Sequence, residues 1–281
     1  MATIRLKRNE SFYIREGWFE KAINTIGETE KNIFYKNDGI KYLGIGSNMV
    51  KGLKYWLKAA DVIDPNTNLL SDFGNILFDY DKYLDELFSW FMIHYKLTKN
   101  EDECPIAYEI FNSDIKQFTK TSVLEYLTNK LLSKDDNVNP KYIDADLNIF
   151  LRSYYNDNTK INPEDNLVCP LSRLKLLDKE KDAYKRIRPS YNSLSYLVVF
   201  YALEDLYEVE SFDIDESMEA KNSPMKIFNL DKYLYLQYLD DMRKNGLITI
   251  NKTAGLNTVY FERRLELEDI FNEYFGGRKN V

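Results

Sequence analysis

Residues 44–74 read GIGSNMVKGLKYWLKAADVIDPNTNLLSDFG, and this stretch decides the fold predicted for the N-terminal part of the chain. Apolar residues recur at helical spacing from Met49 to Ala60, while three lysines fall together on another face of the same helix. The lysines are Lys51, Lys54 and Lys58. One face of this helix can therefore pack against a core while another is cationic.

The residues around this helix complete the pattern of a winged helix-turn-helix. Gly44 and Gly46 indicate a tight turn, and Ser47 or Asn48 can cap the helix N-terminus, where unpaired backbone N–H groups also suit a phosphate. Residues 62–74 contain two short apolar runs separated by turn residues, which predict a two-stranded wing. We therefore predict that Ser47, Asn48 and the three lysines bind DNA. The alternative is a winged helix that docks on a protein, with its lysines simply solvated.

The composition indicates a folded protein with an uneven charge distribution. The 281 residues are 44% hydrophobic and 15% aromatic, which is enough for two or three small domains with substantial cores. The net charge of -7 argues against an indiscriminate nucleic-acid coat protein, because affinity for phosphate comes mainly from clustered Lys and Arg. Through residue 60, however, eleven basic residues stand against six acidic ones, so the N-terminal part is basic and the remainder acidic.

Several kinds of chemistry find no support in the sequence. Cys104 and Cys169 lack metal-like spacing, and no leader or long apolar segment is present, so we expect a reduced cytoplasmic protein without membrane contact. His94 lies in a heavily apolar helix, which predicts a buried core imidazole rather than a catalytic base. The chain has no Gly-rich phosphate loop with its lysine and no Cys/His zinc cluster. We therefore expect no nucleotide or organic cofactor.

A similar arrangement recurs near the C-terminus. Residues 230–244 read as an amphipathic helix ended by Asn245-Gly246 as a left-handed cap, and two β-rich runs follow at 247–250 and 258–261. The turn between these runs is predicted at 253–255. The helix mixes acids with bases, so we expect a protein-docking or structural module rather than a second DNA reader.

Between these two modules the sequence predicts a mostly helical region. Helical spacing is found at 85–96, 104–112, 121–132, 141–155 and 193–206, with a small hairpin within 174–188 and a candidate linker at 133–137. We therefore predict a mainly α (α+β) protein in three regions. They are a winged helix-turn-helix region at 1–100, a central mostly helical region at 101–190 and a C-terminal winged-helix-like region at 191–281.

Several separated motifs resemble one known family in their order along the chain. They are ESFYIREGW at 10–18, LGIGSNMV at 43–50, WFMIHY at 90–95, CPL at 169–171 and TAGL at 253–256. Together they resemble a bacterial family of unknown function that includes SspB, the DNA-nicking component of single-strand DNA phosphorothioation systems. Asn9 is a departure, because the family often has histidine at this position, before the glutamate of the first motif. If that histidine takes part in the chemistry of relatives, its absence here weakens the expectation of nicking activity.

This resemblance implies a role in DNA modification and antiphage defence. DNA would be nicked so that sulfur can replace a non-bridging phosphate oxygen. The implied partners are double-stranded DNA and the other proteins of such systems, namely a cysteine desulfurase, an ATP-using sulfur transferase and an ATPase. A homo-oligomer is a further expectation.

Acidic residues provide candidates for a nicking site. Phosphodiester hydrolysis commonly uses carboxylates that hold Mg²⁺ or Mn²⁺, with a nearby cation. Asp81, Asp85 and Glu86 follow the predicted wing, and Asp81 would share a helix face with Asp85. Glu10 and Arg15 offer a second acid and a guanidinium that can clamp phosphate. We therefore predict Glu10, Arg15, Asp81 and Glu86 as catalytic, and Asp81, Asp85 and Glu86 as ligands of Mg²⁺ or Mn²⁺. Alternatively, the acids at 81–86 cap the next helix, complement its dipole and stay solvated.

Three functions thus remain open. The first is a DNA-binding nickase subunit. The second is a non-catalytic adaptor that binds DNA and recruits modification enzymes through its acidic C-terminal half. The third is a winged-helix transcriptional regulator that binds a short operator, although no residue pattern separates sequence-specific reading from backbone binding.

Overall fold

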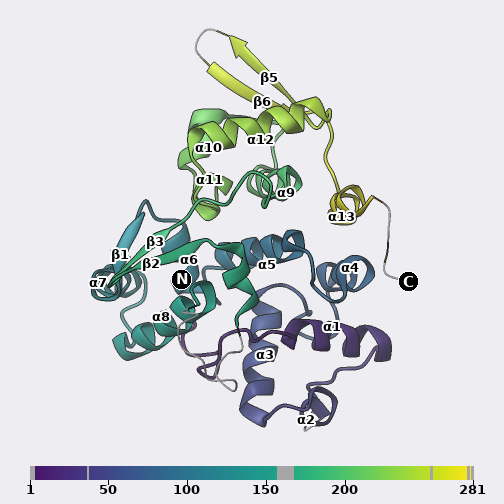
Figure 1. The fold of residues 1–281 in the computed structure, drawn as a ribbon, viewed down its shortest axis with the longest axis vertical. Helices are drawn as coiled ribbons and strands as arrows, with labels where there is room; N and C mark the ends of the chain where they lie inside the picture. Colours follow the sequence, from purple (N-terminus) through teal and green to yellow (C-terminus); the bar gives the residue numbers. More distant parts are fainter. Residues whose placement is uncertain (1–3, 37, 157–167, 254–255, 277–278, 280–281) are drawn as a thin grey trace.

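The computed structural model describes residues 4–36, 38–156, 168–253, 256–276 and 279 (Figure 1). Within this part of the chain, the fold is helix-rich and contains two antiparallel sheets of three strands each, an α+β architecture. The sheets lie within residues 117–186 and 211–261. Each sheet therefore falls inside one of the predicted regions, although the boundaries at 100 and 190 themselves stay predictions.

The N-terminal part is built from helices. They are α1 (Trp18–Thr29), α2 (Asp38–Leu43), α3 (Ser47–Ala59), α4 (Asp72–Asp81) and α5 (Leu87–Lys99). The lysine-bearing helix predicted from the sequence is α3, and its apolar face is buried as expected through Leu53, Trp56 and Leu57. A 13-residue helix with a single apolar stripe is the kind of element that periodicity predicts well.

The wing predicted at 62–74 is largely absent. One isolated antiparallel bridge joins Ile63 to Leu70, and α4 begins at Asp72, where a second strand was expected. A Cβ atom at Gly74 would lie 2.0 Å from the carbonyl oxygen of Val62, so the chain folds back too closely for a side chain at that position. Because the chain can fold back this closely, α4 begins at Asp72 and the segment does not continue as a second strand.

The central part contains the first sheet. Its elements are α6 (Pro105–Phe111), β1 (Gln117–Thr119), α7 (Lys120–Leu132), α8 (Pro140–Tyr154), η1 (Pro170–Leu174), β2 (Leu177–Glu180) and β3 (Ala183–Arg186). The strand order is β1-β3-β2, which confirms the predicted hairpin and adds β1 to it. The predicted linker at 133–137 joins α7 to α8, and Lys134 forms ion pairs with Glu101 and Glu109. This segment is therefore a loop within the central part.

The C-terminal part contains the second sheet. Its elements are α9 (Tyr196–Leu206), β4 (Ser211–Asp213), α10 (Ile214–Glu219), α11 (Pro224–Ile227), α12 (Lys232–Lys244), β5 (Ile248–Thr253), β6 (Leu256–Phe261) and α13 (Leu267–Phe275). The strand order is β4-β6-β5. Gly246 has φ 70°, which confirms the predicted left-handed cap after α12. Residues 254 and 255 of the predicted hairpin turn lie outside the described residues.

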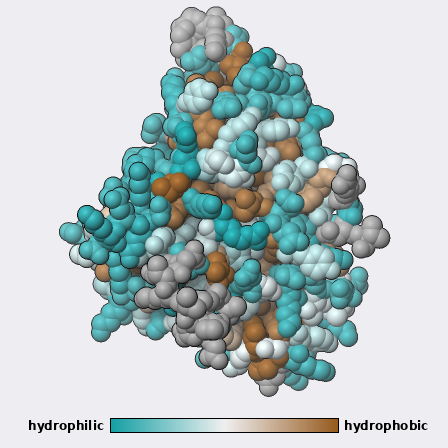
Figure 2. All heavy atoms as spheres, in the orientation of Figure 1, coloured by the Kyte–Doolittle hydropathy of each residue, from teal (hydrophilic) through white to brown (hydrophobic). Residues whose placement is uncertain are grey.

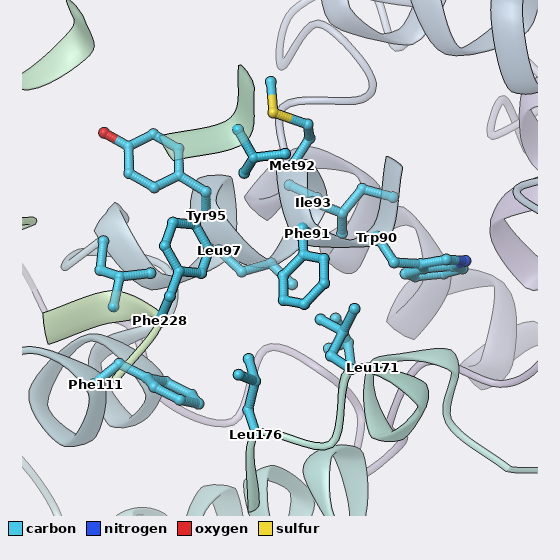
Figure 3. Close-up of a cluster of buried hydrophobic side chains, with 14 of the residues drawn as sticks. Trp90, Phe91, Met92, Ile93, Tyr95, Leu97, Phe111, Leu171, Leu176 and Phe228 are labelled. Carbon is cyan, nitrogen blue, oxygen red and sulfur yellow. The ribbon is translucent and has the colours of Figure 1, made fainter. Parts of the chain in front are cut away.

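Helix α5 lies at the centre of the hydrophobic core. Every residue from Phe88 to Thr98 is buried. Figure 3 shows side chains of α5 surrounded by Phe111 of α6, Leu171 of η1, Leu176 and Phe228. A helix that is apolar on all sides is expected to be buried, and here it supplies the common core of the N-terminal, central and C-terminal parts.

His94 confirms the prediction of a core imidazole. Its Nδ1 lies 2.8 Å from the hydroxyl of Tyr154 on α8, and its Nε2 lies 3.3 Å from the carbonyl oxygen of Ile227 on α11. Burial lowers the pKa of His94 to about 3, so the imidazole is neutral at physiological pH. The residue joins elements from the three parts of the chain.

Helix α13 ties the C-terminal part to α4 and α5. Phe271 is fully buried, and its ring lies 6.2 Å from Phe73, 6.1 Å from Tyr80 and 5.0 Å from Phe88. Tyr274 stacks on Phe88 with a centroid distance of 3.9 Å. Every helix in the described ranges is too short or too polar to cross a membrane.

Candidate nucleic-acid interface

One side of α3 carries the polar residues predicted to contact DNA. Ser47, Lys51, Lys54 and Lys58 recur at helical spacing and form one stripe along the helix. Ser47, Asn48 and Lys51 are exposed, while Lys54 and Lys58 are half-buried. The helix is capped by Gly46 without a side-chain hydrogen bond, so the predicted capping by Ser47 or Asn48 is wrong. Both residues are already inside the first turn.

The three lysines have different surroundings. The Nζ of Lys58 donates to the carbonyl oxygen of Pro65 at 2.7 Å and so holds the 62–70 loop against the helix. The Nζ of Lys54 lies 5.7 Å from the centroid of the Phe34 ring, and burial, followed by repulsion from Lys58, lowers the pKa of Lys54. Lys51 is the most exposed of the three. Lys51 and Lys54 are therefore the better probes of ligand binding.

A tight turn of the N-terminal segment packs on another side of α3. The N–H of Phe12 donates to the carbonyl oxygen of Asn9 at 2.9 Å, and the two residues between them, Glu10 and Ser11, have φ 50° and 65°. Non-glycine residues rarely adopt this left-handed conformation. A Cβ at Gly52 would lie 2.8 Å from the Asn9 carbonyl oxygen, so this glycine allows the turn to approach the helix backbone. Glu10 is exposed at the turn.

Arg15 lies on the same N-terminal segment and is half-buried. Its guanidinium carbon is 5.4 Å from the ring centroid of Phe12 and 5.6 Å from that of Trp18. Glu10 and Arg15 form no ion pair with each other. The structure therefore places both predicted residues on the segment that packs against α3, without pairing them, and their catalytic roles stay predictions.

Residues 5–15, here called the N-terminal arm, also contact α8. The amide nitrogen of Asn9 donates to Oδ1 of Asp146 at 2.9 Å, and the backbone N–H of Lys7 donates to Oδ2 at 2.7 Å. Burial raises the pKa of Asp146. Asn9 is 4% exposed, so the residue that departs from the family pattern is a buried partner of this carboxylate. Sequence reasoning missed Asp146 because 137 positions separate it from Asn9.

The acids predicted as a second cluster lie at the junction of α4, α5 and α13. Helix α4 ends at Asp81, and Leu84, with φ 52°, interrupts the helical path before α5. The prediction that Asp81 shares a helix face with Asp85 is therefore wrong. The carboxylate of Asp81 accepts hydrogen bonds from the backbone N–H groups of Asp85 at 3.0 Å and Glu86 at 3.3 Å. Glu86 Oε2 accepts from the hydroxyl of Tyr274 at 3.2 Å. Two of the three acids thus have structural partners.

The geometry does not gather these acids into a metal site. Throughout the described residues, no three side chains of His, Cys, Asp or Glu are grouped so that they could hold a metal ion. The buried carboxylate of Asp81 faces backbone donors, and burial raises its pKa to about 6. The residues present therefore do not fit the predicted Mg²⁺ or Mn²⁺ site, and the roles assigned to Asp81, Asp85 and Glu86 rest on the sequence alone.

Comparisons with known proteins agree on one family and one fold. Residues 6–275 match a family described as "Protein of unknown function (DUF4007)". A magnesium ion-bound SspB crystal structure is 21% identical, with 97% of this chain and 88% of that chain covered and a TM-score of 0.83. A second SspB crystal structure is 20% identical, with 98% of this chain and 90% of that chain covered and a TM-score of 0.83. No curated protein matches this chain.

Proposed function

The chain belongs to the DUF4007 family, and on that premise we propose that it is a DNA-binding protein of a DNA phosphorothioation system. The observation that carries the DNA-binding proposal is the cationic stripe of α3, in which Lys51 is exposed and Lys54 half-buried, in a chain with a net charge of -7. The link to phosphorothioation is supported by the motifs that resemble the SspB family and by the fold shared with two SspB structures. The proteins that supply sulfur would be its partners.

Backbone contacts explain how α3 would bind. Lys51 and Lys54 would neutralise phosphates and release their counterions, which makes affinity fall as salt increases. Ser47 and Asn48 add hydrogen-bonding groups at the first turn of α3, where the helix dipole favours an anion. Contacts of this kind position a protein on the duplex without reading its sequence. The proposal is therefore for backbone binding rather than for an operator-specific regulator.

Nicking is a finer proposal that rests on the resemblance and on the N-terminal arm. Glu10 lies in the strained turn that packs on α3, and the guanidinium of Arg15 lies farther along the same segment, over the Phe12 ring. Such strain is found often at functional sites. One of the two similar structures is magnesium ion-bound, but the described residues of this chain offer no three-ligand metal site. We therefore assign no step to a metal here.

An adaptor is the second candidate function. Tyr35, which follows the Phe34 that Lys54 overlies, is 59% exposed, and Ile40 on the neighbouring helix α2 is 39% exposed. Figure 2 shows hydrophobic atoms at the lower end of the molecule, where Figure 1 places α2 and one end of α3. Exposed apolar groups in a polar surround suit a protein partner. This end could therefore recruit another protein while the lysines hold DNA.

Supercoiled plasmid distinguishes these possibilities. The full chain would be incubated with plasmid in Mg²⁺, in Mn²⁺ and in chelator, next to a Lys51→Glu/Lys54→Glu variant. Metal-dependent open circles that are lost in the variant would support nicking through α3. Plasmid binding without nicks would support the adaptor. Absence of binding by the wild-type chain at low salt would refute the proposed function.

A further inference from the structure

The central and C-terminal parts repeat one topology. The order α6-β1-α7-α8-β2-β3 matches the order α9-β4-α10-α12-β5-β6, with η1 inserted between α8 and β2 in the first set and α11 between α10 and α12 in the second. In both, the first strand pairs antiparallel with the last strand of the hairpin, which gives the orders β1-β3-β2 and β4-β6-β5. This is the topology of a winged helix. The last α-helix before the hairpin, α8 or α12, holds the place of the helix that enters the DNA groove in helix-turn-helix proteins.

We propose that α8 is a second nucleic-acid-binding surface, joined to α3 by the N-terminal arm, and that its ligand is a duplex long enough to cross both helices. This inference rests on the proposed function and extends it to a second helix.

The two equivalent helices differ in charge and polarity. On α12, Tyr233 is 77% exposed and Leu236 is 39% exposed. The bases of its last turn, Arg243 and Lys244, each pair with Asp240 at 2.7 Å. This surface has no surplus of cations for phosphates. The topology therefore offers two candidate helices, and composition argues against α12.

On α8, the acids are already neutralised or covered. Asp144 forms an ion pair with Lys120 at 2.8 Å, and the carboxylate of Asp146 accepts from the arm through Lys7 and Asn9. Lys141 and Arg152 of the same helix are exposed, and neither forms an ion pair with another described residue. The exposed charge of α8 is therefore positive.

The arm adds cations to this surface. The Nζ of Lys7 lies 5.1 Å from the ring centroid of Tyr142, and the guanidinium carbon of Arg152 lies 4.8 Å from that of Tyr13. These contacts lay the arm along α8, with Lys7 near the N-terminal end of the helix and Arg152 near its C-terminal end. Arg8, next to Lys7 on the arm, is also exposed. A cation over an aromatic face keeps its outward N–H groups available to a phosphate.

The arm then continues onto α3. Beyond the hydrogen bond of Asn9 to α8, the Phe12 carbonyl oxygen accepts from Nε1 of Trp56 on α3 at 2.8 Å, and the turn at 9–12 packs on Gly52. Figure 1 shows the N-terminal segment running between α8 and α3. The two cationic helices are therefore held by one segment. A ligand that spans both must be long and anionic, which fits a duplex better than a nucleotide or a peptide.

Binding of the full chain to labelled duplexes of increasing length tests this inference. Wild type, the α3 variant Lys51→Glu/Lys54→Glu, the α8 variant Lys141→Glu/Arg152→Glu and the matched α12 control Lys232→Glu/Lys244→Glu would be titrated at several salt concentrations. We expect the α8 variant to lose about tenfold or more in affinity for long duplexes. The salt slope, which is the slope of the logarithm of the binding constant against the logarithm of the salt concentration, should be smaller in magnitude by about 2. The control should bind like wild type.

Two results separate failure of this inference from failure of the proposed function. If the α8 variant binds like wild type with an unchanged salt slope while the α3 variant is weakened, α8 is not a contact surface and the proposed function stands. If neither the α3 variant nor the α8 variant binds DNA more weakly than wild type, both this inference and the proposed function fail. Should the α8 variant unfold, judged by circular dichroism, the arm variant Lys7→Gln/Arg8→Gln replaces it. The same loss of affinity and slope is then expected, and wild-type binding would overturn the inference.

Discussion

At Asp81, opposing influences set the charge of one carboxyl group. Burial favours the neutral acid, while hydrogen bonds from the backbone N–H groups of Asp85 and Glu86 favour the carboxylate. Burial prevails and raises the pKa to about 6. The sequence shows the acid but neither its burial nor its backbone donors, so it could not distinguish a metal ligand from a residue that orders the turn before α5.

The raised pKa of Asp81 predicts a pH dependence of stability. Because the folded state binds this proton more tightly than the unfolded chain, the resulting stabilisation is fully present below about pH 4 and is lost as pH rises through about 6. Relative to Asp81→Asn, wild type should lose about 2 kcal/mol of unfolding free energy between pH 4 and 7. Urea denaturation of both proteins across this range measures the difference. A difference that stays constant with pH would contradict the assignment.

Gly52 predicts a steric effect on the turn at 9–12. A Cβ at this position would lie 2.8 Å from the Asn9 carbonyl oxygen, whereas a Cβ at Gly46 would meet nothing within 4 Å. Gly52→Ala should therefore lower the unfolding free energy by about 1 to 3 kcal/mol through overpacking. Chemical denaturation checks this, with Gly46→Ala as the matched control. Equal stability of the two variants would show that the turn does not depend on this contact.

At the scale of elements, α13 has the most direct test. Phe271 is fully buried among Phe73, Tyr80 and Phe88. Phe271→Ala should cost about 3 to 5 kcal/mol of unfolding free energy, because it leaves a cavity between α13 and α4–α5. Tyr274→Phe, which removes only the hydrogen bond to Glu86, should cost about 1 kcal/mol. A small effect of Phe271→Ala would mean that α13 does not hold the C-terminal part in place.

Elements with a long apolar stripe could be predicted from the sequence, and elements set by close contacts could not. Helices α3, α8 and α12 lie within two residues of their predicted bounds. The prediction of a wing at 62–74 was wrong, because the close approach of Gly74 to the Val62 backbone lets α4 begin at Asp72, where the second strand was expected. The prediction that Asp81 and Asp85 share one helix was wrong, because Leu84 between them adopts a left-handed conformation that is rare for leucine.

At the scale of the whole molecule, the burial of His94 depends on the packing of the N-terminal, central and C-terminal parts against one another. Burial lowers its pKa to about 3, below the value of about 6.5 expected when unfolded, so its contribution to stability is present above pH 6.5 and is lost as pH falls. Relative to His94→Phe, wild type should lose about 1.4 kcal/mol between pH 7.5 and 5.5. Comparison of the two proteins by denaturation cancels the opposite contribution of Asp81. An unchanged difference would indicate that the imidazole is not buried.

The residues of the candidate interface could be predicted from the sequence only where they lie close together along the chain. The lysines of α3 follow from helical spacing within 13 residues. The contact of the N-terminal arm with α8 joins residues 137 positions apart, and neither side carries a motif that indicates the other. The repeated topology was also hidden, because β1 and β4 have three residues each and no long alternating pattern. Short strands acquire their pairing from tertiary structure.

The measurement that tests the central claim most directly is the salt dependence of duplex binding by the full chain, followed by fluorescence anisotropy. Wild-type affinity should fall steeply with salt. Lys51→Glu/Lys54→Glu should bind about tenfold or more weakly with a slope smaller by about 2, and Lys232→Glu/Lys244→Glu should bind like wild type. Equal affinity and equal salt slope for the α3 variant and wild type would contradict the claim that α3 binds DNA.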